Sequence, residues 1–461
     1  MVFSALTFLC VFLPILICIY FLVRPLAVKN AVLVLASLLF YAYGEPVYIV
    51  LMVVSIVVNY CFGRIIGAGK HKKAALVTAV VLNLGVLGVF KYAGWLTQMA
   101  ISAFGLSVKP VELSLPIGIS FYTFQALSYL IDVYRGECAS QKNAVSFFLY
   151  ISFFPQLIAG PIVKYHDIES QISDRHPTPQ SVAEGLRRFI IGLGKKVLIA
   201  NIMAGAADAA FALDAAQTST LSAWIGAVAY LMQIYFDFSG YSDMAIGLGR
   251  IFGFKFLENF NYPYISGTVK EFWRRWHISL STWFREYLYI PLGGNRKGRL
   301  RTCVNKIIVF FCTGLWHGAN LTFVVWGLFH GAFLLLEDFV PIKKLPAVIR
   351  HIYTVLVVCV GFVIFRSDDM GQAGLMISHM FSGFTITNAQ WVRTAPILTP
   401  MFITFLAIAV IGASPAWRKL AGRINGSARE VLSYVYAAGL LVLSILYLSG
   451  GAYNPFIYFR F

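Results

Sequence analysis

Long apolar runs recur along the whole chain, and they constrain its fold more than any other feature of the sequence. Each run holds about 20 residues, enough for one helix to cross a hydrocarbon core of about 30 Å. Only 12% of the 461 residues are charged and 59% are hydrophobic, whereas roughly a quarter of a soluble protein is charged. We therefore expect an all-α polytopic membrane protein with roughly ten to twelve transmembrane helices. No long polar segment separates two halves, so residues 1–461 are expected to form a single domain.

Basic residues gather in short connections between the apolar runs, and the net charge is +17. Lys and Arg are enriched in cytoplasmic loops, which predicts an inner (cytoplasmic) membrane protein with Arg24, Lys29 and the cluster at 70–73 in the cytoplasm. This orientation leaves the N-terminus external. Nothing resembles a soluble basic domain, so a nucleic-acid partner is not expected. The cysteines include no C-x-x-C pair, which argues against a zinc site or a disulfide framework.

Three stretches depart from simple spans. Residues 145–163 are apolar but contain Pro155, Gly160 and Pro161, which predicts a kinked or re-entrant segment buried in protein. Residues 164–184 are polar and are expected to form an exposed linker. Residues 265–305 interleave arginines with Trp and Tyr, a pattern typical of helices that lie at the cytoplasmic interface.

Three histidines, His277, His317 and His330, stand in or beside apolar segments, where polar groups are costly and call for a functional explanation. His317 has the most informative neighbours. Gly318 permits close approach of a ligand or of backbone, and Asn320 can orient the imidazole or donate to a developing oxyanion. Because desolvation keeps a buried histidine neutral, His317 is a candidate general base.

Other kinds of site explain these residues less well. His317 and His330 are 13 residues apart, about 20 Å along one helix, so they would not share an ion and no metal is expected. Ser239 near Asp237 suggests a serine hydrolase, but no G-x-S-x-G elbow exists, and both residues equally suit hydrogen bonds between helices. Asp237 and Asp243 within an apolar run also fit an ion pathway, so a transporter or flippase is the alternative from a different class.

Five motifs stand between residues 113 and 320. They are L-P-I-G-I-S-F-Y at 115–122, F-F-P-Q-L-I-A-G-P at 153–161, Y-F-D-F-S-G-Y-S-D at 235–243, E-F-W-R-R-W-H-I-S-L-S at 271–281 and W-H-G-A at 316–319. Together they resemble the membrane-bound O-acyltransferase family, in its bacterial branch that acetylates polysaccharides such as alginate. The resemblance implies membrane helices, with interfacial or re-entrant helices, around a central funnel or tunnel that holds the active site.

The resemblance also implies roles for individual residues. His317 is the catalytic residue, and His277 is a second functional position towards the cytoplasmic donor side. Tyr458, in the C-terminal P-F-I-Y-F-R-F at 455–461, matches a tyrosine proposed as an acyl relay, although an aromatic anchor at the membrane interface explains that tail equally well. Asp237, Ser239, Trp316 and Asn320 are expected to support the site.

The expected reaction moves an acetyl group from a cytoplasmic thioester to an extracytoplasmic polysaccharide such as alginate. Acetyl-CoA or an acyl carrier protein is the expected donor, with no bound cofactor. Arg274, Arg275 and Arg285 suit the phosphates of such a donor. An extracytoplasmic acetyltransferase of the SGNH type, or a similar partner, is expected to complete the transfer. D-alanyl transfer to teichoic acid and O-acetylation of peptidoglycan are the alternatives within this class.

Overall fold

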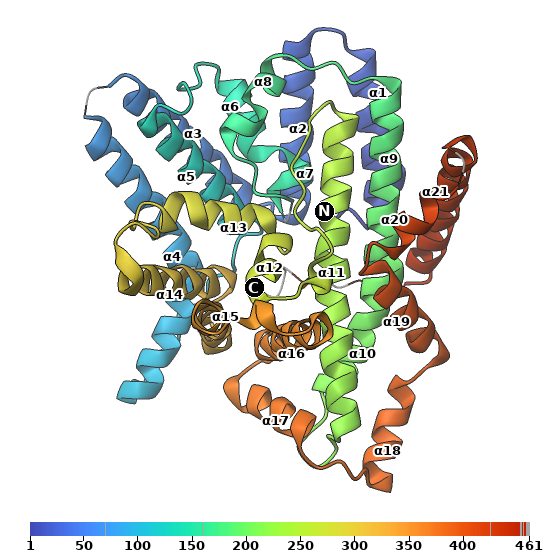
Figure 1. Ribbon diagram of the computed structural model, residues 1–461. Coiled ribbons are helices and arrows are strands. Elements are labelled where there is room, and N and C mark those ends of the chain that lie inside the picture. The colour runs from blue at the N-terminus through green and yellow to red at the C-terminus, as the bar shows by residue number, and fades with distance from the viewer. Residues whose placement is uncertain (70, 159, 425, 452–453, 455, 458–461) are drawn as a thin grey trace. The chain divides into compact units, whose positions relative to one another are not determined.

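The computed structural model in Figure 1 describes residues 1–461 except 70, 159, 425, 452–453, 455 and 458–461, and the described residues form helices without a β-strand. They divide into two compact units that alternate along the sequence. Unit 1 comprises Met1–Phe189 and Ser242–Leu257, and unit 2 comprises Ile190–Tyr241 and Glu258–Phe461. The predicted all-α fold class is confirmed, while the expectation of a single domain stays a prediction.

Unit 1 is a set of helices packed around α5, Ile119–Arg135, which is buried along most of its length. Its buried side chains include polar ones, among them Gln125, Ser128 and Asp132, so α5 lies in the interior of the unit on all sides. The other elements that lie within unit 1 are a π-helical turn at Phe8–Phe12, α1 Leu13–Leu22, α2 Leu26–Gly44, α3 Tyr48–Gly67, α4 Lys72–Phe104, α6 Ala144–Ser152, α7 Phe154–Leu157 and α8 Tyr165–Ser173. Two long helices, α9 Pro179–Gly194 and α11 Thr220–Ile251, contribute residues to both units.

The predicted break within residues 145–163 is confirmed. Helix α6 ends at Ser152, and α7 starts two residues later with Pro155 in its first turn. The backbone N–H of Phe154, freed by the break, donates to the Ser37 hydroxyl at 3.1 Å. The segment is buried, so protein rather than water supplies this partner, as non-helical backbone at membrane depth requires.

The expectation of an exposed linker at residues 164–184 was wrong. This stretch contains α8 and the start of α9, and α8 buries Tyr165, Ile168 and Ile172. The spacing of these three side chains follows one face of a helix, so a short amphipathic helix was hidden in a stretch that is polar on average.

Unit 2 is built on α10, α11, α14, α15 and α16, with several shorter helices. The hairpin of α14 and α15 packs against α16, and α12 lies against α15 and α16 (Figure 1). The elements not yet given bounds are π-helical turns at Lys195–Ala200 and Arg285–Tyr289, 3₁₀ turns at Pro263–Ile265, Ile342–Lys344 and Ala395–Ile397, and helices α10 Asn201–Phe211, α12 Val269–Arg275, α13 Ile278–Phe284, α14 Gly298–His317, α15 Leu321–Phe339, α16 Ala347–Arg366, α17 Met370–Phe381, α18 Asn388–Thr394, α19 Pro400–Gly412, α20 Ala416–Ala421 and α21 Gly426–Ser449.

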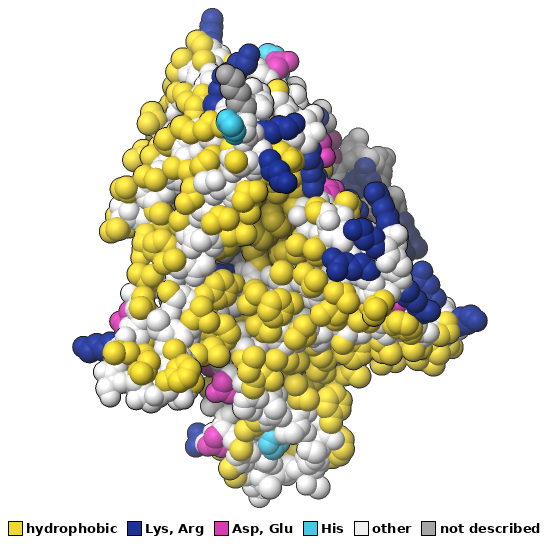
Figure 2. Space-filling model, turned by 90° about the vertical axis from the view of Figure 1, so that its left-hand side faces the viewer, with side chains coloured by type: hydrophobic (Ala, Val, Ile, Leu, Met, Phe, Trp, Pro, Cys, Tyr) yellow, Lys and Arg dark blue, Asp and Glu magenta, His cyan; other side chains and the backbone are white. Residues whose placement is uncertain are grey.

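Among the described residues, 8 helices are long and apolar enough to cross a membrane, or 9 if a bent pair is counted as one span. The expected ten to twelve also included the shorter apolar helix Phe8–Leu22 and the span at α14. Many hydrophobic side chains are exposed on the spanning helices, as lipid contact requires. Figure 2 shows one face on which hydrophobic side chains predominate and Lys and Arg gather in one area. The protein is therefore a multi-pass membrane protein.

Candidate active site

His317 is the last residue of α14, and α15 begins four positions later. The two helices form a tight hairpin because glycines lie at their contacts. A Cβ at Gly314 would overlap a carbonyl oxygen of α15, and one at Gly327 would overlap a carbonyl oxygen of α14. Small residues at such positions let helix backbones approach closely in membranes. Gly318 makes room for the ring of Phe323, so the close approach predicted at this glycine is made by an aromatic side chain.

Three aromatic rings surround the buried His317 imidazole. The ring centroids of Trp316, Trp326 and Phe365 lie 4.9, 5.0 and 5.2 Å from that of His317, each nearly perpendicular to it. The two tryptophans come from α14 and α15, and the phenylalanine comes from α16. The site is thus an apolar cage around one ionisable side chain, in agreement with the surroundings expected of a neutral histidine.

The distance argument applied to His330 was wrong. His317 and His330 lie on separate helices, because the chain turns between α14 and α15. Both imidazoles contact Trp326, whose ring lies 5.0 Å from His317 and 5.2 Å from His330. His330 Nδ1 accepts a hydrogen bond of 3.4 Å from Trp273 Nε1, which links α15 to α12. This bond gives His330 a structural contact between the two helices.

His277 lies between α12 and α13 with a left-handed backbone, φ +44°. Such a conformation is uncommon for a residue with a side chain and draws attention to function. The imidazole is buried, with Nδ1 3.3 Å from Asn259 Oδ1 and the Phe238 ring 4.6 Å away. Burial lowers the pKa of His277 to about 3, so the ring is neutral at physiological pH.

Trp316 brings the two predicted histidines into one cluster. Its ring lies 5.9 Å from that of His277 and 4.9 Å from that of His317. We call His277, Trp316 and His317 the histidine cluster. All three side chains are buried and all belong to unit 2. Residues 40 positions apart in the sequence therefore meet around one indole, as a shared site requires.

Asp237 forms a buried ion pair with Lys196, at 2.7 Å between Oδ1 and Nζ. Its Oδ2 accepts a hydrogen bond of 2.8 Å from the backbone N–H of Ile457. The carboxylate thereby holds Ile457. The next residue in the chain after Asp237 is Phe238, whose ring contacts His277. Lys196 is buried, and it compensates the charge of Asp237.

The remaining residues that the sequence predicted to act at the site are Ser239, Tyr458 and Asn320. Ser239 is buried, and its hydroxyl has no hydrogen-bond partner within the described part of the chain. Tyr458 lies outside the described residues. Asn320 caps α15, where Oδ1 accepts from the Thr322 N–H at 3.2 Å and Nδ2 donates to the Asp368 carbonyl at 2.7 Å. The predicted bond to the imidazole is not among the hydrogen bonds of Asn320 in the described residues.

The three arginines predicted to bind the donor differ in availability. Arg275 is half-buried and holds the fold, because it donates to Glu271 at 3.0 Å and to the Asn261 carbonyl at 3.1 Å. Arg285 is exposed and pairs with the neighbouring Glu286 at 2.9 Å. Arg274 is exposed on the same segment. Arg274 and Arg285 are therefore the better placed to meet a ligand in solvent.

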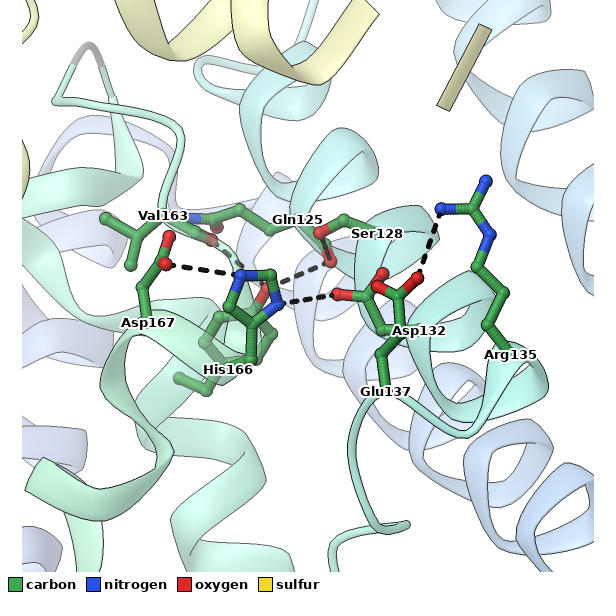
Figure 3. Close-up of polar contacts among 9 residues, drawn as sticks. Gln125, Ser128, Asp132, Arg135, Glu137, Val163, His166 and Asp167 are labelled. Atoms are coloured by element: carbon green, nitrogen blue, oxygen red, sulfur yellow. Dashed lines mark hydrogen bonds and ion pairs between the residues drawn. The ribbon is translucent and has the colours of Figure 1, made fainter. Parts of the chain in front are cut away.

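One group of side chains in the described residues could share a metal ion, and it lies in unit 1 rather than in the histidine cluster. We call Asp132, Glu137 and His166 the acidic cluster (Figure 3). His166 Nδ1 lies 3.2 Å from Asp132, His166 Nε2 lies 3.3 Å from Asp167, and Glu137 pairs with Arg135 at 3.8 Å. These contacts link the three side chains of the acidic cluster to Asp167 and Arg135. The expectation of a metal-free reaction stays a prediction.

A sequence model of the membrane-bound O-acyltransferase family matches residues 135–342, a range that includes His277 and His317. The "probable alginate O-acetylase" of Azotobacter vinelandii is 41% identical, over 100% of this chain and 100% of its own length. This chain belongs to the membrane-bound O-acyltransferase family. The family assignment suggested by the five motifs is thereby confirmed.

Other members of the family are similar over nearly the same length. The protein of the same name in Pseudomonas putida is 41% identical over 100% of both chains. A peptidoglycan O-acetyltransferase of Helicobacter pylori is 34% identical over 100% of this chain and 98% of its own. The chain is an O-acyltransferase, and the interpretation as a transporter or flippase is set aside.

Proposed function

We propose that this O-acyltransferase moves acetyl groups from a cytoplasmic thioester across the inner membrane for O-acetylation of an extracytoplasmic polysaccharide. Alginate is the acceptor that the relatives support best, because two proteins named for it are 41% identical over the whole chain, against 34% for the peptidoglycan O-acetyltransferase. The observation that carries the proposal is the histidine cluster, in which two buried imidazoles share Trp316. A neutral imidazole in an apolar cage is suited to accept a proton at physiological pH.

In the proposed reaction, His317 is the general base. It takes the proton of an acceptor hydroxyl while the hydroxyl oxygen attacks the thioester carbonyl. A C–O bond forms and the C–S bond breaks, and the thiolate leaves and takes up the proton. Dipoles around the cage stabilise the oxyanion that develops on the carbonyl oxygen. His277 is the second functional residue, on the donor side.

Acetyl-CoA or an acyl carrier protein is the proposed donor, and no bound cofactor takes part. Arg274 and Arg285, which are exposed, are suited to contact its phosphates from the cytoplasm, with Arg275 holding the segment that carries them. This orientation follows the basic connections and leaves the N-terminus external.

On the external side, we propose that an SGNH-type acetyltransferase or a similar partner passes the acetyl group to the polymer. Tyr458 is proposed as the relay residue. This proposal rests on the C-terminal motif, because Tyr458 lies outside the described residues.

The acceptor is tested by ester analysis of cells in which His317→Ala replaces the wild-type protein. O-acetyl esters are measured separately in the exopolysaccharide and in peptidoglycan, together with D-alanyl esters on teichoic acid where the cell makes it. Loss of esters from the exopolysaccharide alone is the expected result, with the variant present in the membrane in normal amount. Loss confined to peptidoglycan would assign the protein to the activity named for the Helicobacter pylori relative.

A further inference from the structure

Asn259 is fully buried beside His277, and its side chain is held through the amide oxygen Oδ1. Its Oδ1 accepts from the backbone N–H of Ser279 at 3.1 Å and from the Ser279 hydroxyl at 2.9 Å. Its backbone carbonyl accepts from the N–H of Ile278 at 3.0 Å. Asn259 therefore holds the two residues that follow His277, and its amide has a defined orientation.

The orientation of the amide decides which nitrogen of His277 carries the proton. A backbone N–H only donates, so the atom of Asn259 that faces the Ser279 N–H is the oxygen. The same oxygen lies 3.3 Å from His277 Nδ1. An acceptor pairs with a donor, so Nδ1 carries the proton and the neutral ring keeps its lone pair on Nε2.

The lone pair on Nε2 of His277 lies in apolar surroundings. The atom is buried and has no hydrogen-bond partner among the described residues. The rings packed on His277, those of Phe238 and Trp316, carry no charge. A buried polar atom without a partner is costly and is rare in folded proteins. A substrate group that donates to Nε2 would remove that cost.

We propose that Asn259 is a positioning residue, which holds His277 as the Nδ1–H tautomer so that Nε2 accepts a hydrogen bond from an O–H or N–H group of the substrate. This inference rests on the proposed acyl transfer. Burial keeps the ring neutral, which preserves the lone pair at physiological pH. Residues that orient a functional histidine through its other ring nitrogen act in this way in many sites.

The test uses membranes from cells that express the full-length protein, supplied with [¹⁴C]acetyl-CoA at saturating and limiting concentrations. Label in base-labile esters is measured per folded protein. Asn259→Leu removes the acceptor at similar size, and we expect kcat to fall about 10- to 100-fold with a smaller change in KM. Asn83→Leu is the matched control, because Asn83 is a buried asparagine of unit 1 that hydrogen-bonds to Asn59. It should lose stability while its rate per folded molecule stays within about twofold of wild type.

Asn259→Asp separates positioning from a purely structural role. The carboxylate of Asp still accepts a hydrogen bond from Nδ1–H, so this variant should be more active than Asn259→Leu. Its negative charge favours the protonated imidazole and therefore raises the pKa of His277. Protonated His277 has no lone pair, so the pH below which the rate declines should move upward. If Asn259→Leu does not fold, this variant decides alone.

A rate of Asn259→Leu within about twofold of wild type, an equal loss in Asn83→Leu, or an unmoved acid limb in Asn259→Asp would overturn the inference. Failure of the proposed function has a different signature. If the proposed function is wrong, membranes with the wild-type protein transfer no label, and the inference about Asn259 is then wrong as well.

Discussion

The histidine cluster of unit 2 and the acidic cluster of unit 1 both place histidine beside other functional side chains, but their surroundings are opposite. In the acidic cluster, His166 lies between Asp132 and Asp167, and the cluster is partly exposed. The histidine cluster is buried among aromatic rings, and the Nε2 atom of His277 has no hydrogen-bond partner in the described residues. The proposed site is therefore the cluster with a buried polar atom in apolar surroundings, and not the cluster with the higher density of ionisable groups.

The largest effect expected after loss of His317 itself is that of His277→Ala. This change removes the imidazole that shares Trp316 with His317, and we expect acetyl transfer to fall about 100-fold or more. Label transfer from [¹⁴C]acetyl-CoA in membranes is the measurement, and the amount of inserted protein serves as control. Activity close to wild type would show that the cluster contains one functional histidine rather than two.

Lys196→Met should mainly affect stability. It leaves Asp237 buried without its cation, and breaking one side of a buried pair costs about 3–5 kcal/mol. Thermal unfolding of the detergent-purified protein measures the loss. The double variant Lys196→Met/Asp237→Leu should recover much of it, because no isolated charge remains. Equal stability of the single and double variants would contradict the buried pair.

Trp316→Phe should lower the rate about tenfold without removing either histidine, because a smaller ring leaves both imidazoles less firmly placed. Trp224→Phe is the matched control. Trp224 is a partly buried tryptophan of unit 2 whose Nε1 donates to the Met380 carbonyl at 2.8 Å. A common loss in both variants would mean that Trp316 supports packing alone.

The smallest effect concerns the acidic cluster. EDTA added to the membranes should change the rate by less than about twofold, because the proposed transfer takes place at the histidine cluster and needs no metal ion at the acidic cluster. Restoration of a lost rate by one added divalent metal would instead assign the cluster a metal and reverse the comparison between the two regions.

Sequence motifs located the histidine cluster because its members lie in two short runs, R-R-W-H and W-H-G-A. Trp316 brings these two runs into contact. This contact depends on which helices pack against each other, and the sequence does not say which pairs of helices pack together. The error about His330 has a simple cause. The distance estimate treated His317 and His330 as parts of one helix, whereas the chain turns between α14 and α15.

Lys196 and Asn259 were missed for different reasons. A buried Asp237 requires a cation as partner, but the sequence contains many basic residues, and no pattern distinguishes Lys196 from the others. Asn259 belongs to no motif, and its meaning depends on one oxygen that meets both Ser279 and His277. No periodicity or spacing in the sequence reports such a contact.

The central claim is that acyl transfer takes place at the histidine cluster. The most direct test compares His317→Ala with His166→Ala in membranes supplied with [¹⁴C]acetyl-CoA. We predict that His317→Ala transfers no label above background while His166→Ala keeps a rate within about twofold of wild type, with both proteins inserted in equal amount. Label transfer by His317→Ala at the wild-type rate would contradict the claim.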